Sequence, residues 1–289
     1  MKNVLITGIA GGFGKPTALA LLQKGYSVAG SVRSRSGKNA ATVIELEAAG
    51  AKIVEMDVTD ATSTERGVAD AISQLGGLDI LFNNAGIGSY GIQELMSPED
   101  MARVFDVNVM GVQRVMRAAL PHLRAQARGT VLYTSSLIGR IATPFYGTYS
   151  ASKWALEAIV ECYRTELSSF GIESCIIEPG AMPTAFFDGM VTPNDATREV
   201  EYGEFAAVPA MSNAGLAEML KATPEQRPER IAEAVVALLD MPFGEKPFRT
   251  VVDYVGVGTE IERYNEVLHD VTRNILTNFG IEQMLDLNA

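Results

Sequence analysis

The chain has 289 residues, with 24 Lys and Arg against 35 Asp and Glu, which gives a formal net charge of −11. This acidic balance offers no basic surface to nucleic acid or to an anionic membrane, so neither is expected as a partner. Hydrophobic residues make up 47% and charged residues 20%, which is typical of a globular protein with a sizeable core and excludes a disordered or fibrous chain.

Apolar runs of strand length alternate with helix-like segments along the whole chain. They lie at residues 4–6, 26–32, 52–56, 78–82, 130–134, 173–177 and 250–255. Most of these runs are continuously apolar, as expected for strands that are covered on both faces of a sheet. Repeated strand–helix–strand units predict a doubly wound α/β fold (Rossmann fold), a parallel sheet of about seven strands with helices on both faces.

A glycine-rich turn follows the first expected strand directly. Glycine permits positive φ and lets a phosphate approach the backbone, while the N–H groups of the helix expected from residue 15 favour an anion. A glycine-rich turn without a ligand is the structural alternative. The strand–turn–helix context favours a dinucleotide site formed by Gly8, Gly12, Phe13 and Gly14.

The second expected strand ends in a loop that contains Arg33, Arg35 and Lys38 and no acidic residue. An acid at this point binds the ribose diol of NAD, whereas arginine accommodates the 2′-phosphate of NADP. The loop therefore predicts NADP(H) as the preferred cofactor, with Arg33 and Arg35 as cofactor-binding residues and NAD(H) as a second cofactor that the site could accept. The alternative is a solvated loop of an acidic protein.

A helix is expected to begin near Ser97-Pro98-Glu99, because a capping residue followed by proline and an acid is typical of a helix amino terminus. Its apolar stripe consists of Met101, Val104, Phe105, Val112, Val115 and Met116. Asn108 falls on this core-facing stripe, where a buried amide must be hydrogen-bonded. It is either a purely structural asparagine or a functional one.

Tyr149 and Lys153 are four residues apart in a helix-like segment, so both side chains project from one face. An ammonium about 4 Å from a phenolate contributes about 4 kcal/mol at an effective dielectric constant near 20. That energy would lower the pKa of the tyrosine by at most about three units, towards neutrality. Such a tyrosine could act as a general acid and base.

A pair of serines, Ser135 and Ser136, closes the fifth expected strand, at the edge where open α/β sheets bind their ligands. A hydroxyl there could donate a hydrogen bond to a carbonyl oxygen. Spacing alone leaves open which serine faces the site, and both could simply cap the turn. Asp57 after the third strand and Asn83-Asn84-Ala85-Gly86 after the fourth could likewise be turn chemistry alone.

Two stretches break the alternation of strands and helices. Residues 184–227 contain no clear strand and many apolar side chains, which is typical of a lid-like insertion. Residues 258–289 form an amphipathic tail that is expected to pack on its own subunit or on a neighbouring one. No linker or repeat separates these parts, so residues 1–289 are expected to form a single domain.

Two cysteines, Cys162 and Cys175, and two histidines, His122 and His269, are too few and too scattered for a disulfide framework or a zinc site. The apolar run near the amino terminus is too short for a signal peptide, and no run of about 18 apolar residues occurs. We therefore expect reduced thiols, no metal and a cytoplasmic location.

Together these motifs resemble the short-chain dehydrogenase/reductase family over about residues 3–257. The family's T-G-x-x-x-G-x-G motif matches Thr7 to Gly14, its N-N-A-G motif matches Asn83 to Gly86, and its Tyr-x-x-x-Lys motif matches Tyr149 and Lys153. The family's helical asparagine corresponds to Asn108, and its Pro-Gly turn with a following threonine corresponds to Pro179, Gly180 and Thr184. The family's catalytic serine lies thirteen residues before the tyrosine, which selects Ser136.

The resemblance implies a role for each of these residues in hydride transfer. Tyr149 would protonate the carbonyl oxygen and Ser136 would polarise it, Lys153 would bind the nicotinamide ribose and lower the pKa of Tyr149, and Asn108 would hold a water that links Lys153 to solvent. The remaining contacts to the cofactor are implied for the adenosine ribose (Asn84, Ala85, Gly86), the adenine (Asp57, Val58) and the nicotinamide amide (Gly180, Thr184), with Pro179 beside it.

The sequence thus predicts an oxidoreductase that prefers NADP(H) and acts on a ketone or secondary alcohol of apolar character. A nucleotide-sugar epimerase or dehydratase is one alternative, although only about a hundred residues after Gly180 remain for a substrate domain. A non-catalytic NADP-binding sensor or scaffold is the other, although it would not need Ser136, Tyr149 and Lys153 together. The family resemblance also implies a homodimer or homotetramer.

Overall fold

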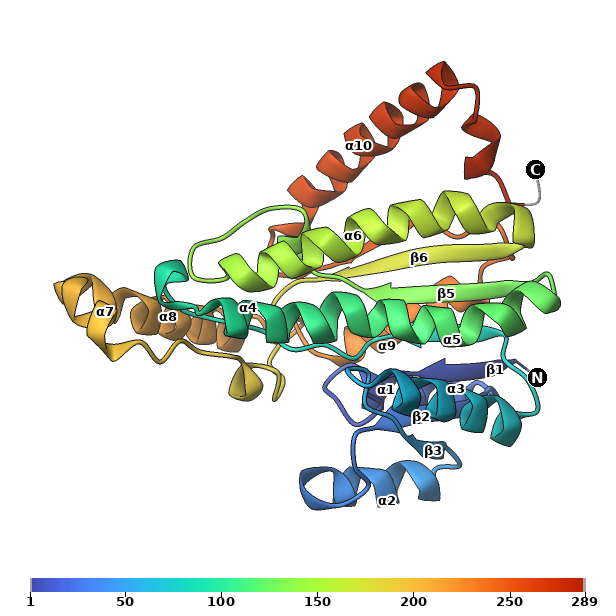
Figure 1. Cartoon of the computed structure of the whole chain (residues 1–289), viewed down its shortest axis with the longest axis horizontal. Helices are drawn as coiled ribbons and strands as arrows, with labels where there is room; N and C mark the ends of the chain where they lie inside the picture. Colours follow the sequence, from blue (N-terminus) through green and yellow to red (C-terminus); the bar gives the residue numbers. More distant parts are fainter. Residues whose placement is uncertain (1, 288–289) are drawn as a thin grey trace.

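A seven-stranded parallel sheet forms the centre of the protein in the computed structural model, which describes residues 2–287 (Figure 1). The strands are β1 (Asn3–Ile6), β2 (Ser27–Val32), β3 (Lys52–Glu55), β4 (Ile80–Asn83), β5 (Gly129–Thr134), β6 (Ile172–Pro179) and β7 (Arg249–Val252). Each expected apolar run has become a strand, and the predicted fold class is confirmed.

The strand order is β3-β2-β1-β4-β5-β6-β7, so the direction of winding reverses between β1 and β4. At this point Val4, Leu5 and Ile6 pair with Ile80, Leu81 and Phe82. The crossovers on the two sides of the reversal leave opposite faces of the sheet. They therefore open a crevice at the carboxyl ends of the strands, where such folds bind ligands.

Helices cover both faces of the sheet and bury two apolar layers. One layer contains α1 (Gly14–Gln23), α2 (Ala40–Ala48) and α9 (Glu229–Asp240), and the other contains α3 (Ala61–Leu75), α5 (Gly111–Ala125) and α6 (Gly147–Leu167). Ile231, Val235, Leu238 and Leu239 of α9 are all buried. Strands buried on both faces explain why the apolar runs are continuous.

The helix expected from Ser97 begins there, as α4 (Pro98–Phe105). The Ser97 hydroxyl accepts from the Asp100 backbone N–H at 3.0 Å, and the Asp100 carboxylate accepts from the Ser97 N–H at 3.3 Å. The expected single helix is, however, interrupted: residues Asp106–Met110 form a π-helical turn before α5 starts. A π turn inserts one extra residue into the helix and often marks a functional site.

The insertion at residues 184–227 is helical and lies beyond the carboxyl ends of the strands (Figure 1). It contains α7 (Ala196–Glu201) and α8 (Val208–Ala222). Polar contacts fasten it to the sheet side at separate points. Val191 bonds to the Gly88–Tyr90 backbone, and the Tyr90 hydroxyl donates to the Pro209 carbonyl at 2.7 Å. The Tyr202 hydroxyl donates to Glu94 at 2.6 Å, and the Gln226 amide donates to the Ala181 carbonyl at 2.7 Å. Short 3-10 helices complete the chain at Gly37–Asn39, Gln93–Leu95, Leu137–Gly139, Ser168–Phe170, Phe187–Gly189, Gly203–Ala207 and Glu282–Leu285.

The carboxyl-terminal tail forms one long helix, α10 (Gly258–Asn278), which stands away from α6 (Figure 1). Only Gly258 and Ile261 of this helix are buried, whereas Val267 is 63% exposed. The turn that follows it returns to pack near the end of α6. Within residues 2–287, no helix, α10 included, is both long enough and apolar enough to cross a bilayer.

Candidate active site

A cavity of about 1420 Å³ runs along the carboxyl edge of the sheet at the reversal of strand order. The glycine turn, the ends of β2 to β6, the start of α6 and the insertion line it. This volume exceeds the 300–1,000 Å³, roughly, of an ordinary ligand site. The cavity can therefore hold a dinucleotide and a second small molecule together.

The glycine turn is shaped by close backbone packing. Gly8 has φ +66°, and a Cβ added there would lie 3.1 Å from the Ala85 Cα. A Cβ on Gly14 would lie 2.5 Å from the Gly8 carbonyl oxygen, and one on Gly12 would lie 2.6 Å from the Thr184 side chain. The turn therefore stays small, and its N–H groups and the start of α1 form a suitable site for a pyrophosphate.

The residues predicted for the turn do not all face the cavity. Gly8, Gly12 and Phe13 line it, and so does Thr184 of the insertion, which closes over Gly12. Gly14 does not line it, because it is buried in the first turn of α1 against Gly8 and Ile9. Its role in the protein itself is to let helix and strand pack closely.

The basic loop after β2 divides into two parts. Arg33 lines the cavity together with Lys38, Asn39 and Thr42. The guanidinium of Arg35 instead donates to the Ile53 carbonyl at 3.0 Å and pairs with Glu47. The structure thus does not bring Arg35 to the site as predicted, because a carboxylate on α2 and a carbonyl of β3 hold it away. Lys38 lines the cavity instead of Arg35. The sequence analysis placed Lys38 in this loop but did not name it as a cofactor-binding residue.

Asp57 lies at the same end of the cavity, beside Val58. Its carboxylate accepts from the Thr59 hydroxyl at 2.7 Å and from the Thr59 N–H at 2.9 Å. Burial alone would raise the pKa of Asp57, but these hydrogen bonds and the charges of Arg33 and Arg114 lower it below its usual range. Asp57 is therefore a carboxylate at neutral pH.

The Asn84 side chain ties the ends of three neighbouring strands together. Its amide donates to the Thr7 carbonyl at 3.0 Å, and its Oδ1 accepts from the Thr134 hydroxyl at 3.3 Å. The Thr7 hydroxyl in turn accepts from the backbone N–H groups of Asn84 and Ala85, both at 2.9 Å. Asn84, Ala85 and Gly86 all line the cavity, so this network fixes the wall against which a ligand would lie.

Ser136, Tyr149 and Lys153 meet in the centre of the cavity wall. Tyr149 and Lys153 project from the first turns of α6 and are 8% and 4% exposed. The Ser136 hydroxyl lies near enough to the Tyr149 phenol to lower its pKa, and it donates to the Pro179 carbonyl at 3.5 Å. The Lys153 ammonium donates to the Thr134 carbonyl at 2.8 Å. Pro179 and Gly180 at the end of β6 complete this wall.

The choice between the two serines follows from the same geometry. Ser136 is half-buried and lies beside the Tyr149 phenol, whereas Ser135 is 2% exposed. The Ser135 hydroxyl points at Gly139, where an added Cβ would lie 2.7 Å from it. Only Ser136 presents its hydroxyl to the tyrosine.

The expected lowering of the Tyr149 pKa is wrong for the protein itself. Burial raises the pKa of Tyr149 well above its ordinary value; the hydrogen bond from Ser136 lowers it in part, and nearby Tyr146 raises it. The Lys153 ammonium is bonded to the Thr134 carbonyl and lies 5.7 Å from the Tyr149 ring centre, too far to offset burial. Burial also lowers the pKa of Lys153, to about 8, against the opposing charge of Glu157.

Asn108 is buried behind the cavity wall, within the π turn, rather than on its surface. Its Oδ1 accepts from the Ile87 N–H at 2.9 Å, and its amide donates to the Ile87 carbonyl at 2.9 Å and to the Ser152 hydroxyl at 3.0 Å. Every hydrogen-bonding atom of the side chain is thus satisfied within the protein. Asn108 anchors the segment after β4 to α6.

The remaining wall of the cavity is apolar. The Phe186 ring lies 5.5 Å from the Tyr149 ring, centre to centre, and Phe187, Val208, Leu216 and Met219 of the insertion face the same space. The sequence analysis did not predict four further residues that line the cavity, Ile138, Ile141, Phe145 and Tyr146. These residues lie between Ser136 and Tyr149 in the chain, and this short spacing was the available signal.

Comparisons with known proteins agree with this geometry. The family model described as short chain dehydrogenase matches residues 2–194. A 3-ketodihydrosphingosine reductase from Bacteroides thetaiotaomicron is 37% identical over 188 residues, which cover 64% of this chain and 65% of the reductase. The alignment thus spans slightly less than two thirds of that relative.

Two solved structures extend the likeness to nearly the whole chain. A short-chain dehydrogenase from Streptomyces avermitilis aligns with a TM-score of 0.74 at 27% identity, covering 96% of each chain. An alcohol dehydrogenase from Thermococcus sibiricus complexed with 5-hydroxy-NADP aligns with a TM-score of 0.69 at 27% identity, covering 87% of this chain and 96% of the other.

Proposed function

The chain belongs to the short-chain dehydrogenase family, and we propose that it is an oxidoreductase that prefers NADP(H) and interconverts a ketone and a secondary alcohol of apolar character. The observation that carries this proposal is the convergence of Ser136, Tyr149 and Lys153 at one point of the cavity wall. The 3-keto group in the name of the Bacteroides relative supports ketone reduction.

The cavity offers a nicotinamide dinucleotide complementary contacts along its length. Gly8 and Gly12 leave room for a pyrophosphate at the start of α1, and Thr184 lies against Gly12. Pro179 and Gly180 line the cavity at the end of β6. Arg33 and Lys38 provide the positive charge that a 2′-phosphate requires, and no acid stands at the end of β2 to bind a ribose diol. The 5-hydroxy-NADP complex of the Thermococcus relative supports the same preference.

The residues of this chain supply the proton chemistry. The chemistry that a bound nicotinamide would provide is the transfer of hydride. In reduction, the Tyr149 hydroxyl gives its proton to the carbonyl oxygen, and Ser136 donates a hydrogen bond to the same oxygen. The high pKa of Tyr149 keeps it protonated for this step. The Lys153 ammonium stabilises the phenolate that forms.

The two alternative functions fit the structure less well. A nucleotide-sugar enzyme needs polar side chains around its substrate, whereas Phe186, Phe187, Leu216 and Met219 line this part of the cavity. A sensor that only binds the nucleotide gains nothing from a serine placed beside a buried tyrosine and lysine. We also propose that the protein works in the cytoplasm as a homodimer or homotetramer, in keeping with the exposed apolar side chains of α10.

Substitution Tyr149→Phe tests the proposal. We expect the loss of Tyr149's hydroxyl to reduce NADPH-dependent ketone turnover by about 10²–10⁴-fold, with NADPH affinity nearly unchanged. Absorbance of NADPH against a panel of apolar ketones measures the first quantity, and nucleotide fluorescence measures the second. Tyr146→Phe is the matched control, because its ring lines the same cavity and we assign its hydroxyl no proton transfer. Full turnover by Tyr149→Phe would refute the acid–base role.

A further inference from the structure

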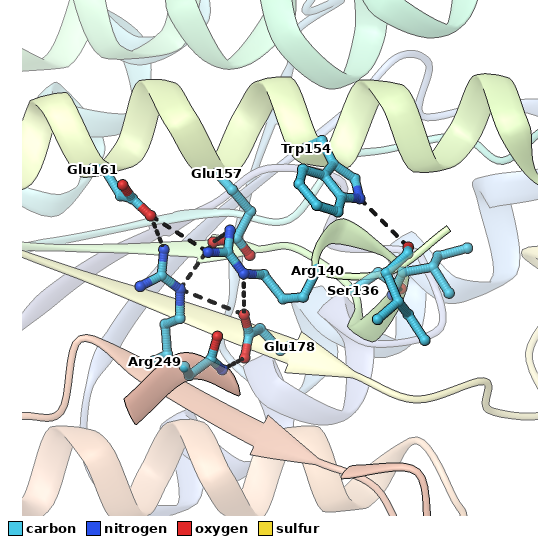
Figure 2. A network of polar contacts seen from close by, with 10 residues as sticks. Ser136, Arg140, Trp154, Glu157, Glu161, Glu178 and Arg249 are labelled. Carbon is cyan, nitrogen blue, oxygen red and sulfur yellow. Dashed lines mark hydrogen bonds and ion pairs between the residues drawn. The ribbon is translucent and has the colours of Figure 1, made fainter. Parts of the chain in front are cut away.

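A cluster of charged side chains lies beside the turn that follows Ser136 (Figure 2). It contains Arg140 after the Ser136 turn, Glu157 and Glu161 on α6, Glu178 on β6 and Arg249 on β7. The Arg140, Glu157, Glu178 and Arg249 side chains are all less than 10% exposed, and both glutamates are at 0%. A buried ion cluster adds little net stability compared with apolar packing, so its position needs another explanation.

Two guanidinium groups hold the Glu157 carboxylate, one from the turn after Ser136 and one from β7. Arg249 Nε lies 3.1 Å and Arg140 Nη1 lies 3.4 Å from the same Glu157 Oε2. Figure 2 shows both arginines between the carboxylates of α6 and Glu178 of β6. This clamp of Arg140 and Arg249 fixes the place of the Glu157 carboxylate.

The cluster is balanced when one of its three carboxylates carries a proton. Burial and the neighbouring Glu157 charge raise the pKa of Glu178 to about 8, against Arg249, Arg140 and a hydrogen bond from Asn265. The Asn265 amide of α10 donates that bond to the Glu178 Oε2 at 2.5 Å. Glu178 is therefore the carboxyl group that takes the extra proton.

Glu157 is also the charged neighbour of Lys153. It stands one helical turn further along α6, on the same face. A Cβ added at Gly139 would lie 3.3 Å from the Lys153 Cβ and 3.5 Å from the Glu157 Cγ, so both side chains pack against this one glycine. Glu157 is the charge that favours the ammonium form of Lys153 against its burial.

We propose that Glu157 is a positioning residue that keeps the buried Lys153 amine charged beside Tyr149, and that Arg140 and Arg249 hold the Glu157 carboxylate in place for this purpose. The effect of Glu157 on catalysis rests on the proposed function. The effect of Glu157 on the charge of Lys153 does not depend on it. Since Arg140 follows the Ser136 turn and Glu178 precedes Pro179, the same clamp also ties together the strand ends that carry the site.

Other groups face this pair from the surrounding elements. Around Lys153 these are the Tyr149 phenol on α6, the Thr134 carbonyl of β5 and the neutral Asn108 amide of the π turn. From α10, the Tyr264 ring lies 5.5 Å from the Arg140 guanidinium. Burial and the charges of nearby arginines, Arg249 among them, lower the pKa of His269. The titrating groups that could imitate Lys153 in a pH profile are therefore Glu178 and His269.

Substitution Glu157→Gln in the full chain tests the proposal. Removing the charge should lower the pKa of Lys153 by at least about one unit, so that at pH 8 the charged fraction falls about fivefold. Trace acetylation with acetic anhydride across pH 6–10, followed lysine by lysine by mass spectrometry, measures this pKa directly. The alkaline limb of kcat/KM for ketone reduction should move to lower pH by the same amount.

Matched carboxylate variants separate this effect from a general disturbance of the cluster. Glu161→Gln removes a charge that touches the same arginines two turns from Lys153, and Glu178→Gln removes the carboxyl that titrates near pH 8. Both should leave the titration of Lys153 within about 0.3 units of wild type. Should Glu157→Gln not fold, the double variant Glu157→Gln/Arg249→Gln removes one charge of each sign and must show the same displacement.

The outcomes separate the two claims. An unchanged Lys153 titration in a folded variant without Glu157 overturns the positioning role, and so does an equal shift in Glu161→Gln or Glu178→Gln. A shifted Lys153 titration in a protein that reduces no ketone and binds no NADPH would support the positioning role and reject the proposed function instead.

Discussion

The preference for NADPH over NADH can be tested at Arg33, the cation that lines the adenosine end of the cavity. Arg33→Ala removes a charge-assisted hydrogen bond to a 2′-phosphate, a contact worth about 1.5–3 kcal/mol. Arg33 is exposed and Lys38 remains beside it, so solvent screening places the effect at the lower end of that range. At about 1.4 kcal/mol per factor of ten, the KM for NADPH should rise about tenfold.

The same substitution should change the KM for NADH less than about twofold, because that nucleotide lacks the 2′-phosphate. Initial rates with each nucleotide at a fixed ketone concentration measure the ratio. Raising the ionic strength from 0.05 to about 0.5 M should weaken NADPH binding by wild type more than by the variant, since the contact is solvent-exposed.

Arg35→Ala is the matched control, two residues further along the same loop. Its guanidinium is held by Glu47 and by the Ile53 carbonyl. We therefore expect an unchanged ratio of the two KM values and at most a small loss of stability. A tenfold effect at Arg35, or equal losses with NADPH and NADH at Arg33, would contradict the assignment and restore the solvated-loop interpretation.

Two further predictions concern packing around the site. Gly30→Ala would place a Cβ 2.2 Å from the Ile9 Cδ1. It should lower the free energy of unfolding, measured by urea denaturation, by about 1–3 kcal/mol. Gly189→Ala is the control and should be near neutral, because the space around Gly189 is open. Asn108→Ala leaves both Ile87 backbone groups without their partner and should cost about 2–4 kcal/mol in the same assay. A loss below about 0.5 kcal/mol in Gly30→Ala or Asn108→Ala would contradict the packing or the anchoring described here.

Much of the fold was predictable because the core is organised by continuous apolar strands. The run Val4-Leu5-Ile6 has no polar alternation, which favours a strand covered on both faces. The cap at Ser97 was equally local, since serine, proline and an acid occupy their preferred places within one turn. Such signals depend on neighbours in sequence and need no knowledge of the tertiary structure.

The features that sequence reasoning missed depend on partners far apart in the chain. Arg33 and Arg35 are equivalent by spacing, and only Glu47 on a separate helix distinguishes them. The π turn at residues 106–110 left the apolar stripe intact and moved the Asn108 amide behind the wall. The spacing of Tyr149 and Lys153 gave their common face, but it could not show that burial outweighs the ammonium.

The two sides of the cavity are held to different degrees, and this difference fits their proposed tasks. The catalytic side is fixed from behind by the Asn84 network, the Asn108 anchor and the charged cluster around Glu157. The insertion opposite is fastened at separate points, such as Tyr90 with the Pro209 carbonyl, and most residues of its helices α7 and α8 are exposed. Local stability follows buried contacts, so substrates of different shape should displace residues 184–227 while leaving Ser136 and Tyr149 where they are. Slower backbone hydrogen exchange in the insertion than in α6 would contradict this division.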